Sequence, residues 1–559
     1  MKAETSWLGR RRSALLLSCA VGTIAAMALR AEPAAAQAFQ GAHVVTSGAA
    51  TRTITGPTSE TIQVESPSAI INWTPTAPVG SGTIDFLPSG NTATFQNGPN
   101  NNDFMVLNRI IPKDLGQKIA FNGHVISQLK NSGGTIVRGG TIVFYSPAGI
   151  IVGSKSVFDV GSLLLTTIDP IVAPGGSFFN AGTYDLRGEV DAKSSILIQQ
   201  GAQINAPVDG SYVAIASPVV QQIGNIRVNG SIGYVAAESL TLNINEGLFD
   251  IEVARGSSSA ADTLVHQGTT GGPASTAAAD VQKIYMVAVP RNAAINLLLQ
   301  GNVGYDAASA AVENGEIILS AGYNVAGTAH EASQLNSTGA TITISQARIT
   351  SDLTGIATTS ASAISNSGQL VSSTQDVTLV APDSRIATSG GAVTIGGSAI
   401  VTTGHGNDFF HFASSGGTAQ VLANGGGIDI AGDLSVVASN VGTGSGDVTG
   451  GLARVSAAGG TITIGRSAAV EANATPGEVA AGAGVGAANG GTAEILASFA
   501  GSVTVGGRSE ISAQGIGGLS FDGPGPGVAR GGTAQVRSDG NGSSISFNSG
   551  LTLDASGFG

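Results

Sequence analysis

The 559-residue sequence has little of three things that most folded domains use. It contains one cysteine, Cys19, only 5% aromatic residues and only 11% charged residues. Without a second cysteine, no disulfide can form within the chain. Hydrophobic residues make up 42% of the sequence, mostly Ala, Val, Ile and Leu, and they stand beside 82 glycines. This composition argues against generic disorder and indicates thin, repetitive β layers.

The N-terminus has the pattern of an export signal. Lys2 and Arg10–Arg12 supply a positive region, and residues 13–29 supply an apolar one. We therefore expect residues 1–38 to be a signal peptide. A retained membrane anchor and a lipid attached at Cys19 are the alternatives, although the apolar run is short for a membrane span and continues past the cysteine.

Small residues after the apolar run offer two cleavage sites. One lies after Ala36 and the other after Ala38, because both have alanine at the first and third positions before the cut. The mature chain is thus expected to begin at Gln37 or Phe39.

Removal of residues 1–38 leaves 20 basic and 35 acidic side chains, a formal charge of −15. An acidic surface repels nucleic acid and anionic lipid, so neither is expected as a partner. A mature chain without cysteine cannot be locked by disulfides in an oxidising periplasm. It can therefore stay unfolded there, which suits a second transport step.

The clearest internal pattern is a repeat near the C-terminus. Variants of one unit, Gly-Gly-Thr-Ala-Gln-Val, begin at Gly416, Gly450, Gly490 and Gly531. Within a unit, residues 418–423, 427–431 and 434–438 alternate large apolar with small or polar residues, as strands with one buried face do. The unequal spacing is expected to fall in Gly/Ala-rich loops, such as residues 443–451 and 477–491.

Three short strands per unit predict an all-β fold, a right-handed parallel β-helix in which each unit forms one coil. An antiparallel β-sandwich is the alternative, but it calls for chain-reversing turns and more core aromatics. The same pattern extends upstream through residues 194–220 and 224–244. The polar stretch 254–280 is expected to be a loop excursion, with a domain boundary near residue 300 and the repeat rod over residues 301–559.

Residues 39–170 carry five short elements in a fixed order. The elements are Ile71-Asn72-Trp73, Asn108-Arg109, Gly123 to Ile126, Ser146-Pro147-Ala148-Gly149-Ile150 and Val160-Gly161-Ser162-Leu163. In this order they resemble the secretion domain of two-partner-secretion exoproteins of the filamentous-haemagglutinin type. The chain departs from the family pattern at two elements. Ser146 and Ala148 stand where the family has two asparagines, and Ser162 replaces a glycine.

The resemblance implies a division of labour within the chain. Residues 39–300 form the secretion domain and its β-helix extension, and an outer-membrane β-barrel transporter with periplasmic binding domains recognises it. The exported rod acts as an adhesin, secreted or at the surface of a Gram-negative cell, with host or cell-surface glycans or proteins as possible ligands. The motif residues expected to serve recognition are Asn72, Trp73, Asn108, Arg109, Ser146, Pro147, Gly149 and Gly161.

Motifs for chemistry are scarce in the sequence. No Gly-x-Ser-x-Gly occurs, and His330-Glu331 lacks the second histidine of a zinc-protease helix because Gln334 stands there. Residues 404–410 resemble one calcium-binding repeat unit, but no tandem copy completes the oxygen shell. We therefore expect no enzyme activity, cofactor or metal, and a core position for Trp73. A β-helical polysaccharide-active enzyme and a purely structural surface or matrix protein remain the alternatives.

Overall fold

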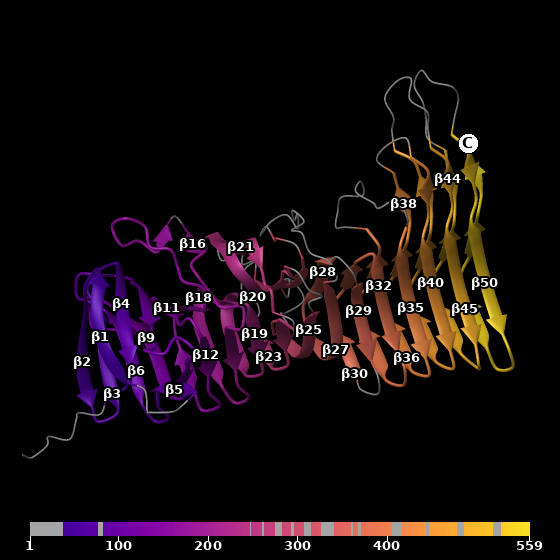
Figure 1. The fold of residues 1–559 in the computed structure, drawn as a ribbon. Helices are drawn as coiled ribbons and strands as arrows, with labels where there is room; N and C mark the ends of the chain where they lie inside the picture. The colour runs from indigo at the N-terminus through magenta and orange to yellow at the C-terminus, as the bar shows by residue number, and fades with distance from the viewer. Residues whose placement is uncertain are drawn as a thin grey trace, which may run out of the picture.

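The computed structural model describes residues 37–76, 82–180, 182–245, 248–259, 262–273, 282–291, 296–306, 315–322, 324–325, 340–358, 361–366, 370–404, 416–442, 446–477, 486–517 and 527–558. Their regular elements are strands, and most pair in parallel along the length of the molecule (Figure 1). No helix in these ranges is long and apolar enough to cross a membrane. The fold is an all-β parallel β-helix, as the repeat pattern predicts.

Three stacks of parallel strands form the walls of the β-helix. Stack 1 consists of β3 (Ser59–Val64), β6 (Thr92–Asn97), β9 (His124–Lys130), β13 (Val157–Asp159), the beginnings of β18 (Gln203–Ser217) and β20 (Asn225–Asn245), β23 (Thr269–Gly271), the ends of β25 (Asn296–Val303) and β27 (Thr341–Ile349), β30 (Leu370–Ser373), β33 (Ala392–Ile395), β36 (Gly427–Ile430), β41 (Thr461–Ile464), β46 (Ser502–Val505) and β51 (Ser544–Phe547).

Stack 2 follows stack 1 in each coil. It consists of β4 (Ser68–Pro75), β7 (Met105–Ile110), β11 (Thr141–Tyr145), β14 (Ser162–Thr166), later parts of β18 and β20, β24 (Lys283–Ala288), β26 (Glu316–Ala321), β28 (Asp352–Thr358), β31 (Val377–Val380), β34 (Ala399–Thr402), β37 (Leu434–Val437), β42 (Ala468–Glu471), β47 (Ser509–Ser512) and β52 (Leu551–Asp554).

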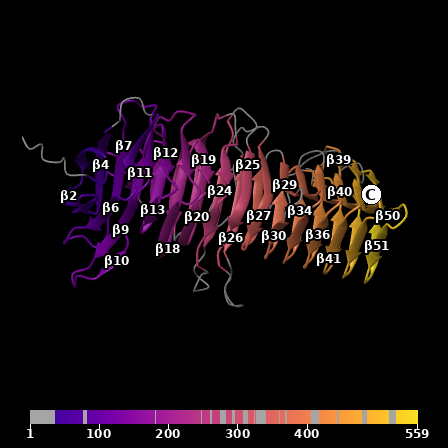
Figure 2. The same cartoon turned by 90° about the horizontal axis from the view of Figure 1, so that it is seen from below.

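Stack 3 closes each coil. It consists of β5 (Thr83–Leu87), β8 (Lys118–Phe121), β12 (Gly149–Val152), β17 (Ser195–Ile198), β19 (Val219–Gln222), β22 (Leu264–His266), the beginnings of β25 and β27, β29 (Ala361–Asn366), β32 (Asp383–Thr388), β35 (Thr418–Asn424), β40 (Leu452–Ala458), β45 (Thr492–Ser498) and β50 (Thr533–Asp539). Figure 2 shows the successive coils side by side along the molecule.

Two antiparallel strands cover the N-terminal end of the β-helix. β1 (Gly41–Ser47) pairs with β4, and β2 (Ala50–Gly56) pairs with β3. We call β1, β2 and the preceding residues 37–40 the cap. Behind it, the interior of the first coils holds a cluster of buried rings, which are Phe39, Trp73, Phe86, Phe95, Phe121, Phe144 and Phe158. The few aromatic residues of the chain are thus concentrated where the solenoid begins.

An antiparallel sheet lies outside the solenoid, against stack 2. It is built from β15 (Phe179–Asn180), β16 (Thr183–Leu186), the end of β20 and β21 (Leu248–Gly256), and Figure 1 shows β16 and β21 set off from the row of coils. Its apolar residues pack on outward side chains of stack 2, among them Ile70, Leu107, Val143 and Leu164. The N-terminal half therefore has a second core outside the helix.

Two smaller parallel ladders extend the C-terminal coils. One contains β38 (Asn440–Val441), β43 (Ala474–Thr475), β48 (Gly515–Ile516) and β53 (Gly557–Phe558), and the other contains β39 (Val448–Thr449), β44 (Ala488–Asn489) and β49 (Ala529–Arg530). They rise from the end of the molecule in Figure 1. The expected loops 443–451 and 477–491 therefore include short strands.

The repeat unit corresponds to the coil as predicted, since the three expected segments become β35, β36 and β37. Its paired glycines are explained by close contact between neighbouring coils. A Cβ on Gly416 would lie 2.1 Å from the nitrogen of Gly451, and one on Gly450 would lie 2.6 Å from that of Gly491. Only glycine fits where these corners stack.

The expected excursion at residues 254–280 is wrong in part. β22 and β23 fall inside that stretch and each takes its place in a stack, because short strands flanked by polar residues still bury Leu264 and Thr270. At the expected boundary near residue 300, β25 pairs with β22 and β23 on one side and with β27 on the other. The strand pairing is thus continuous there. Ala36, His330-Glu331 and residues 405–410 lie outside the described residues.

Candidate functional site

The first two motif elements lie on neighbouring strands of stack 2. Asn72 and Trp73 are on β4, Asn108 and Arg109 are on β7, and the register pairs Asn72 with Arg109. Because side chains alternate along a strand, each motif places one residue inside the coil and one outside. Trp73 and Asn108 point inward and are 1% and 0% exposed.

The two inward residues bond to each other. The indole Nε1–H of Trp73 donates to Oδ1 of Asn108 at 3.0 Å, and Nδ2 of Asn108 donates to the carbonyl of Val143 at 3.4 Å. A buried carboxamide is costly unless it is satisfied in this way. The pair therefore ties the first two coils together and confirms a core position for Trp73.

A buried ion pair beside Trp73 is not predicted by the sequence patterns. Arg52 on β2 contacts Glu60 on β3 at 2.7 Å, with the two side chains 7% and 0% exposed, and the guanidinium lies 5.0 Å from the centre of the Trp73 ring. Burial, followed by the charge of Arg52, lowers the pKa of His43 on β1. The available signal was one basic and one acidic residue on either side of a Gly-Pro turn, in two strands that hold no other charged residue.

The outward residues border a cleft of about 480 Å³, lined by Thr46, Ser47, Ile70, Asn72, Arg109, Val172, Gly175 and Gly176. Arg109 forms an ion pair with Asp169, and its guanidinium carbon lies 5.6 Å from the centre of the Tyr145 ring. Burial raises the pKa of Asp169 against the opposing effect of Arg109. Burial, together with the charge of Asp169, raises the pKa of Tyr145 to about 12.

The fourth motif element is a turn held by contacts from the next coil. Ser146 is fully buried, its N–H donates to the carbonyl of Thr166 at 3.2 Å, and its Oγ has no partner among the described residues. The hydroxyl of Ser194 donates to the carbonyl of Pro147 at 2.5 Å. Gly149 has a φ of +146°, and a Cβ there would lie 2.6 Å from the carbonyl oxygen of Ser195. The turn is thus kept without the two asparagines of the family pattern.

The last motif is a close contact between coils. The N–H of Gly161 donates to Oγ of Ser127 at 2.8 Å, and a Cβ on Gly161 would lie 2.4 Å from the carbonyl oxygen of Gly140. Ser162, which replaces a glycine of the family pattern, accepts the backbone N–H of Tyr212 with its Oγ at 3.2 Å. Its hydroxyl therefore has a structural use in this chain.

Most of the expected recognition residues are inaccessible in the folded molecule. Five are buried, namely Trp73, Asn108, Ser146, Gly149 and Gly161, and the other three, Asn72, Arg109 and Pro147, are partly exposed. Within the described part of the chain, no group of three or more His, Cys, Asp or Glu side chains is placed to hold a metal ion. The described motif residues form a structural framework in which no nucleophile is paired with a base.

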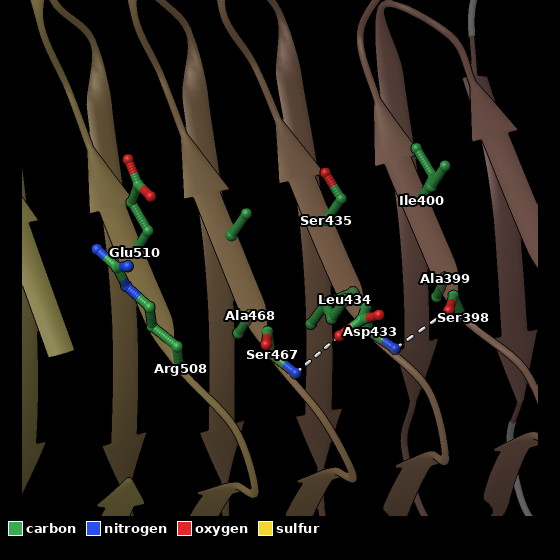
Figure 3. A pocket seen from close by; sticks show the side chains of 11 residues that line it. Ser398, Ala399, Ile400, Asp433, Leu434, Ser435, Ser467, Ala468, Arg508 and Glu510 are labelled. Atoms are coloured by element: carbon green, nitrogen blue, oxygen red, sulfur yellow. Dashed lines mark hydrogen bonds between the residues drawn. The ribbon is translucent and has the colours of Figure 1, made fainter. Parts of the chain in front are cut away.

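A second cleft lies on stack 2 of the rod and is shallow and mainly apolar (Figure 3). It has a volume of about 350 Å³ and runs across successive coils from Ile400 past Ser435 to Arg508 and Glu510. Along its border, the N–H of Ser467 donates to Oδ1 of Asp433 at 2.9 Å. This bond joins neighbouring coils, so it contributes to the stability of the rod.

No protein-family model matches the chain, and no curated protein sequence matches it. Among solved structures, the chain is similar to the HMW1 secretion domain from Haemophilus influenzae, at 17% identity and a TM-score of 0.38, over 92% of this chain and 99% of that one. It is also similar to a filamentous hemagglutinin secretion domain, at 14% identity and a TM-score of 0.31, over 70% and 99% of the two chains. Both of those solved structures are of secretion domains.

Proposed function

We propose that the chain is the exported partner of a two-partner secretion system. An outer-membrane β-barrel transporter recognises its N-terminal segment, residues 39–170, through periplasmic domains and passes the chain outward. The observation that carries this proposal is the convergence of five ordered motif elements on the first coils of a parallel β-helix. The motifs supply the resemblance, and the coils supply a fold that can form stepwise after transport.

Burial of the motif residues constrains how recognition works. Trp73 and Asn108 are at most 1% exposed, and Gly161 is buried as well. A partner therefore cannot reach these three residues once the coils have formed. The transporter therefore reads the unfolded segment, whose extended strands can add to an open sheet edge. Asn72, Arg109 and Pro147 are the expected recognition residues that remain partly accessible after folding.

The exported product is proposed to act as an adhesin-like rod, secreted or at the cell surface. Each coil of a solenoid contacts only its neighbours, so folding can propagate outward as the chain emerges. Loops and short ladders then project from a regular rod and are the surfaces available to a host or cell-surface glycan or protein.

Deletion of the transporter gene tests the transport proposal. We expect the protein to remain in the periplasm of the deletion strain and to return to the surface or medium when the gene is restored. Normal surface appearance without the transporter contradicts the proposal. Adhesion is tested separately by cell binding after removal of the chain, because unchanged adherence favours a purely structural surface role.

A further inference from the structure

Residues 37–40 close the end of the first coil and are part of the fold. Ala38 and Phe39 are both 0% exposed. The Phe39 ring is stacked on Phe86, with centroids 4.8 Å apart, and meets Trp73 edge-on at 5.1 Å. The sequence allows cleavage before Gln37 or after Ala38. The contacts that these two residues make in the cap therefore distinguish the two sites.

Gln37 and Ala38 satisfy three buried or half-buried polar side chains. The N–H of Ala38 donates to Oε2 of Glu60 at 3.0 Å, and Nδ2 of Asn91 donates to the carbonyls of both Gln37 and Ala38 at 3.2 Å. Arg52 donates through Nη2 to Oε1 of Gln37 at 3.2 Å. Glu60 is 1% exposed and Asn91 is 8% exposed, so in the intact cap these bonds take the place of bonds to water.

Cleavage after Ala38 would remove these partners and place a new charge in the cap. The α-ammonium of Phe39 would lie at a fully buried residue, close to Arg52, whose Nη2 donates to the Phe39 carbonyl at 2.8 Å. Two cations, the α-ammonium and Arg52, would then share this end of the coil with the single carboxylate of Glu60, and Asn91 would lose two acceptors. Burial of a charge beside a like charge is strongly unfavourable.

We propose that the export peptidase cuts between Ala36 and Gln37, and that the mature chain keeps Gln37 and Ala38 as structural residues of the cap. This inference rests on the proposed export of the chain. In this proposal Glu60, Asn91 and Arg52 share one role, which is to bind the new N-terminal segment.

The intact mass of the chain recovered from the periplasm or medium tests the assignment. We expect a mass that begins at Gln37, and a mass that begins at Phe39 overturns the inference. An uncleaved chain contradicts the proposed export as well, so the two failures are distinguishable. Ala34→Leu alters the third position before the first site only, and it should reduce correct processing. Ala35→Leu is the matched control, because it changes neither the first nor the third position before the cut. The substituted residue leaves with the signal peptide, so the mature chain should have the same mass as the wild type.

A comparison of two full-length mature chains tests the structural reason. The chain that begins at Phe39 should show faster amide hydrogen exchange in β1 and β2 and a lower denaturant midpoint than the chain that begins at Gln37. Equal exchange and equal midpoints overturn the role assigned to Gln37 and Ala38. Asn91→Ala in the longer chain should reproduce part of the loss, since it removes the bonds to both carbonyls without shortening the chain.

Discussion

Trp73 and Asn108, 35 positions apart in the sequence, form a buried hydrogen bond of 3.0 Å between the first two coils. Both residues belong to motifs that a transporter is proposed to read, yet both are also structural. We therefore expect substitutions at these positions to change stability and transport together.

Asn108→Leu should lower the free energy of unfolding of the N-terminal coils by about 1–3 kcal/mol, because it leaves the Trp73 Nε1–H buried without an acceptor. Tryptophan fluorescence during urea unfolding measures this, since Trp73 is the only tryptophan after the signal segment. Asn100→Ala, on an exposed loop residue, is the control and should leave the midpoint unchanged. Equal midpoints for Asn108→Leu and wild type would show that the bond contributes nothing.

Arg52→Met should cost roughly 3–5 kcal/mol, because it leaves the carboxylate of Glu60 buried without its cation. The double variant Arg52→Met with Glu60→Leu should be more stable than Arg52→Met alone, since it removes the stranded charge as well. Urea midpoints of Arg52→Met, Glu60→Leu and the double variant decide between these outcomes. This explanation is contradicted if the double variant loses as much free energy of unfolding as the two single variants lose together.

Gly161→Ala should destabilise the chain, because its Cβ would lie 2.4 Å from the carbonyl oxygen of Gly140 in the neighbouring coil. Gly149→Ala should do the same by roughly 1–3 kcal/mol, because its φ of +146° strains any residue with a Cβ. Gly82→Ala is the matched control, since a Cβ there meets nothing within 4 Å. Thermal unfolding of all three variants is the measurement, and equal losses would reject the packing argument.

His266 should make the chain less stable in mild acid. Its ring is fully buried, with Nδ1 2.7 Å from the carbonyl of Gln300 and Nε2 2.7 Å from Oγ1 of Thr270. Burial lowers its pKa from 6.5 to about 4. The unfolded chain therefore binds the proton first as the pH falls, and about 3 kcal/mol of stability is lost between pH 6.5 and pH 4.

The His266 prediction is checked by urea midpoints at pH 7, 5 and 4 for wild type and for His266→Gln. The variant should be less stable at pH 7 but should lose less between pH 7 and pH 4. Parallel pH profiles for the two proteins would mean that other groups cause the acid sensitivity.

The sequence predicts the coils better than it predicts their additions. β35, β36 and β37 follow from strict alternation of apolar residues, and β11 and β12 follow from the apolar segments on either side of Pro147. The sheet of β16, β20 and β21 has the same alternation, so pattern alone does not tell an antiparallel excursion from a coil. Strands of two residues, such as β39, carry no periodicity, and they form because a neighbouring coil offers a parallel strand of the same length.

The same limit applies to the candidate site. The motifs identified Trp73 and Asn108, but which residue faces inward depends on the register between β4 and β7. Arg52 and Glu60 were missed because an ion pair across a hairpin has no distinctive spacing in a sequence rich in threonine and serine. The roles of Ser162 and Ser194 depend on contacts with a coil that is remote in sequence.

The transporter is proposed to read the N-terminal segment before it folds. The most direct test is binding of the full mature chain to the purified periplasmic domains of the transporter, either freshly diluted from denaturant or after complete refolding. The freshly diluted chain should bind, and binding should decay at the rate at which the Trp73 environment forms. Equal binding by the refolded chain would contradict the claim, because its motif residues are then buried.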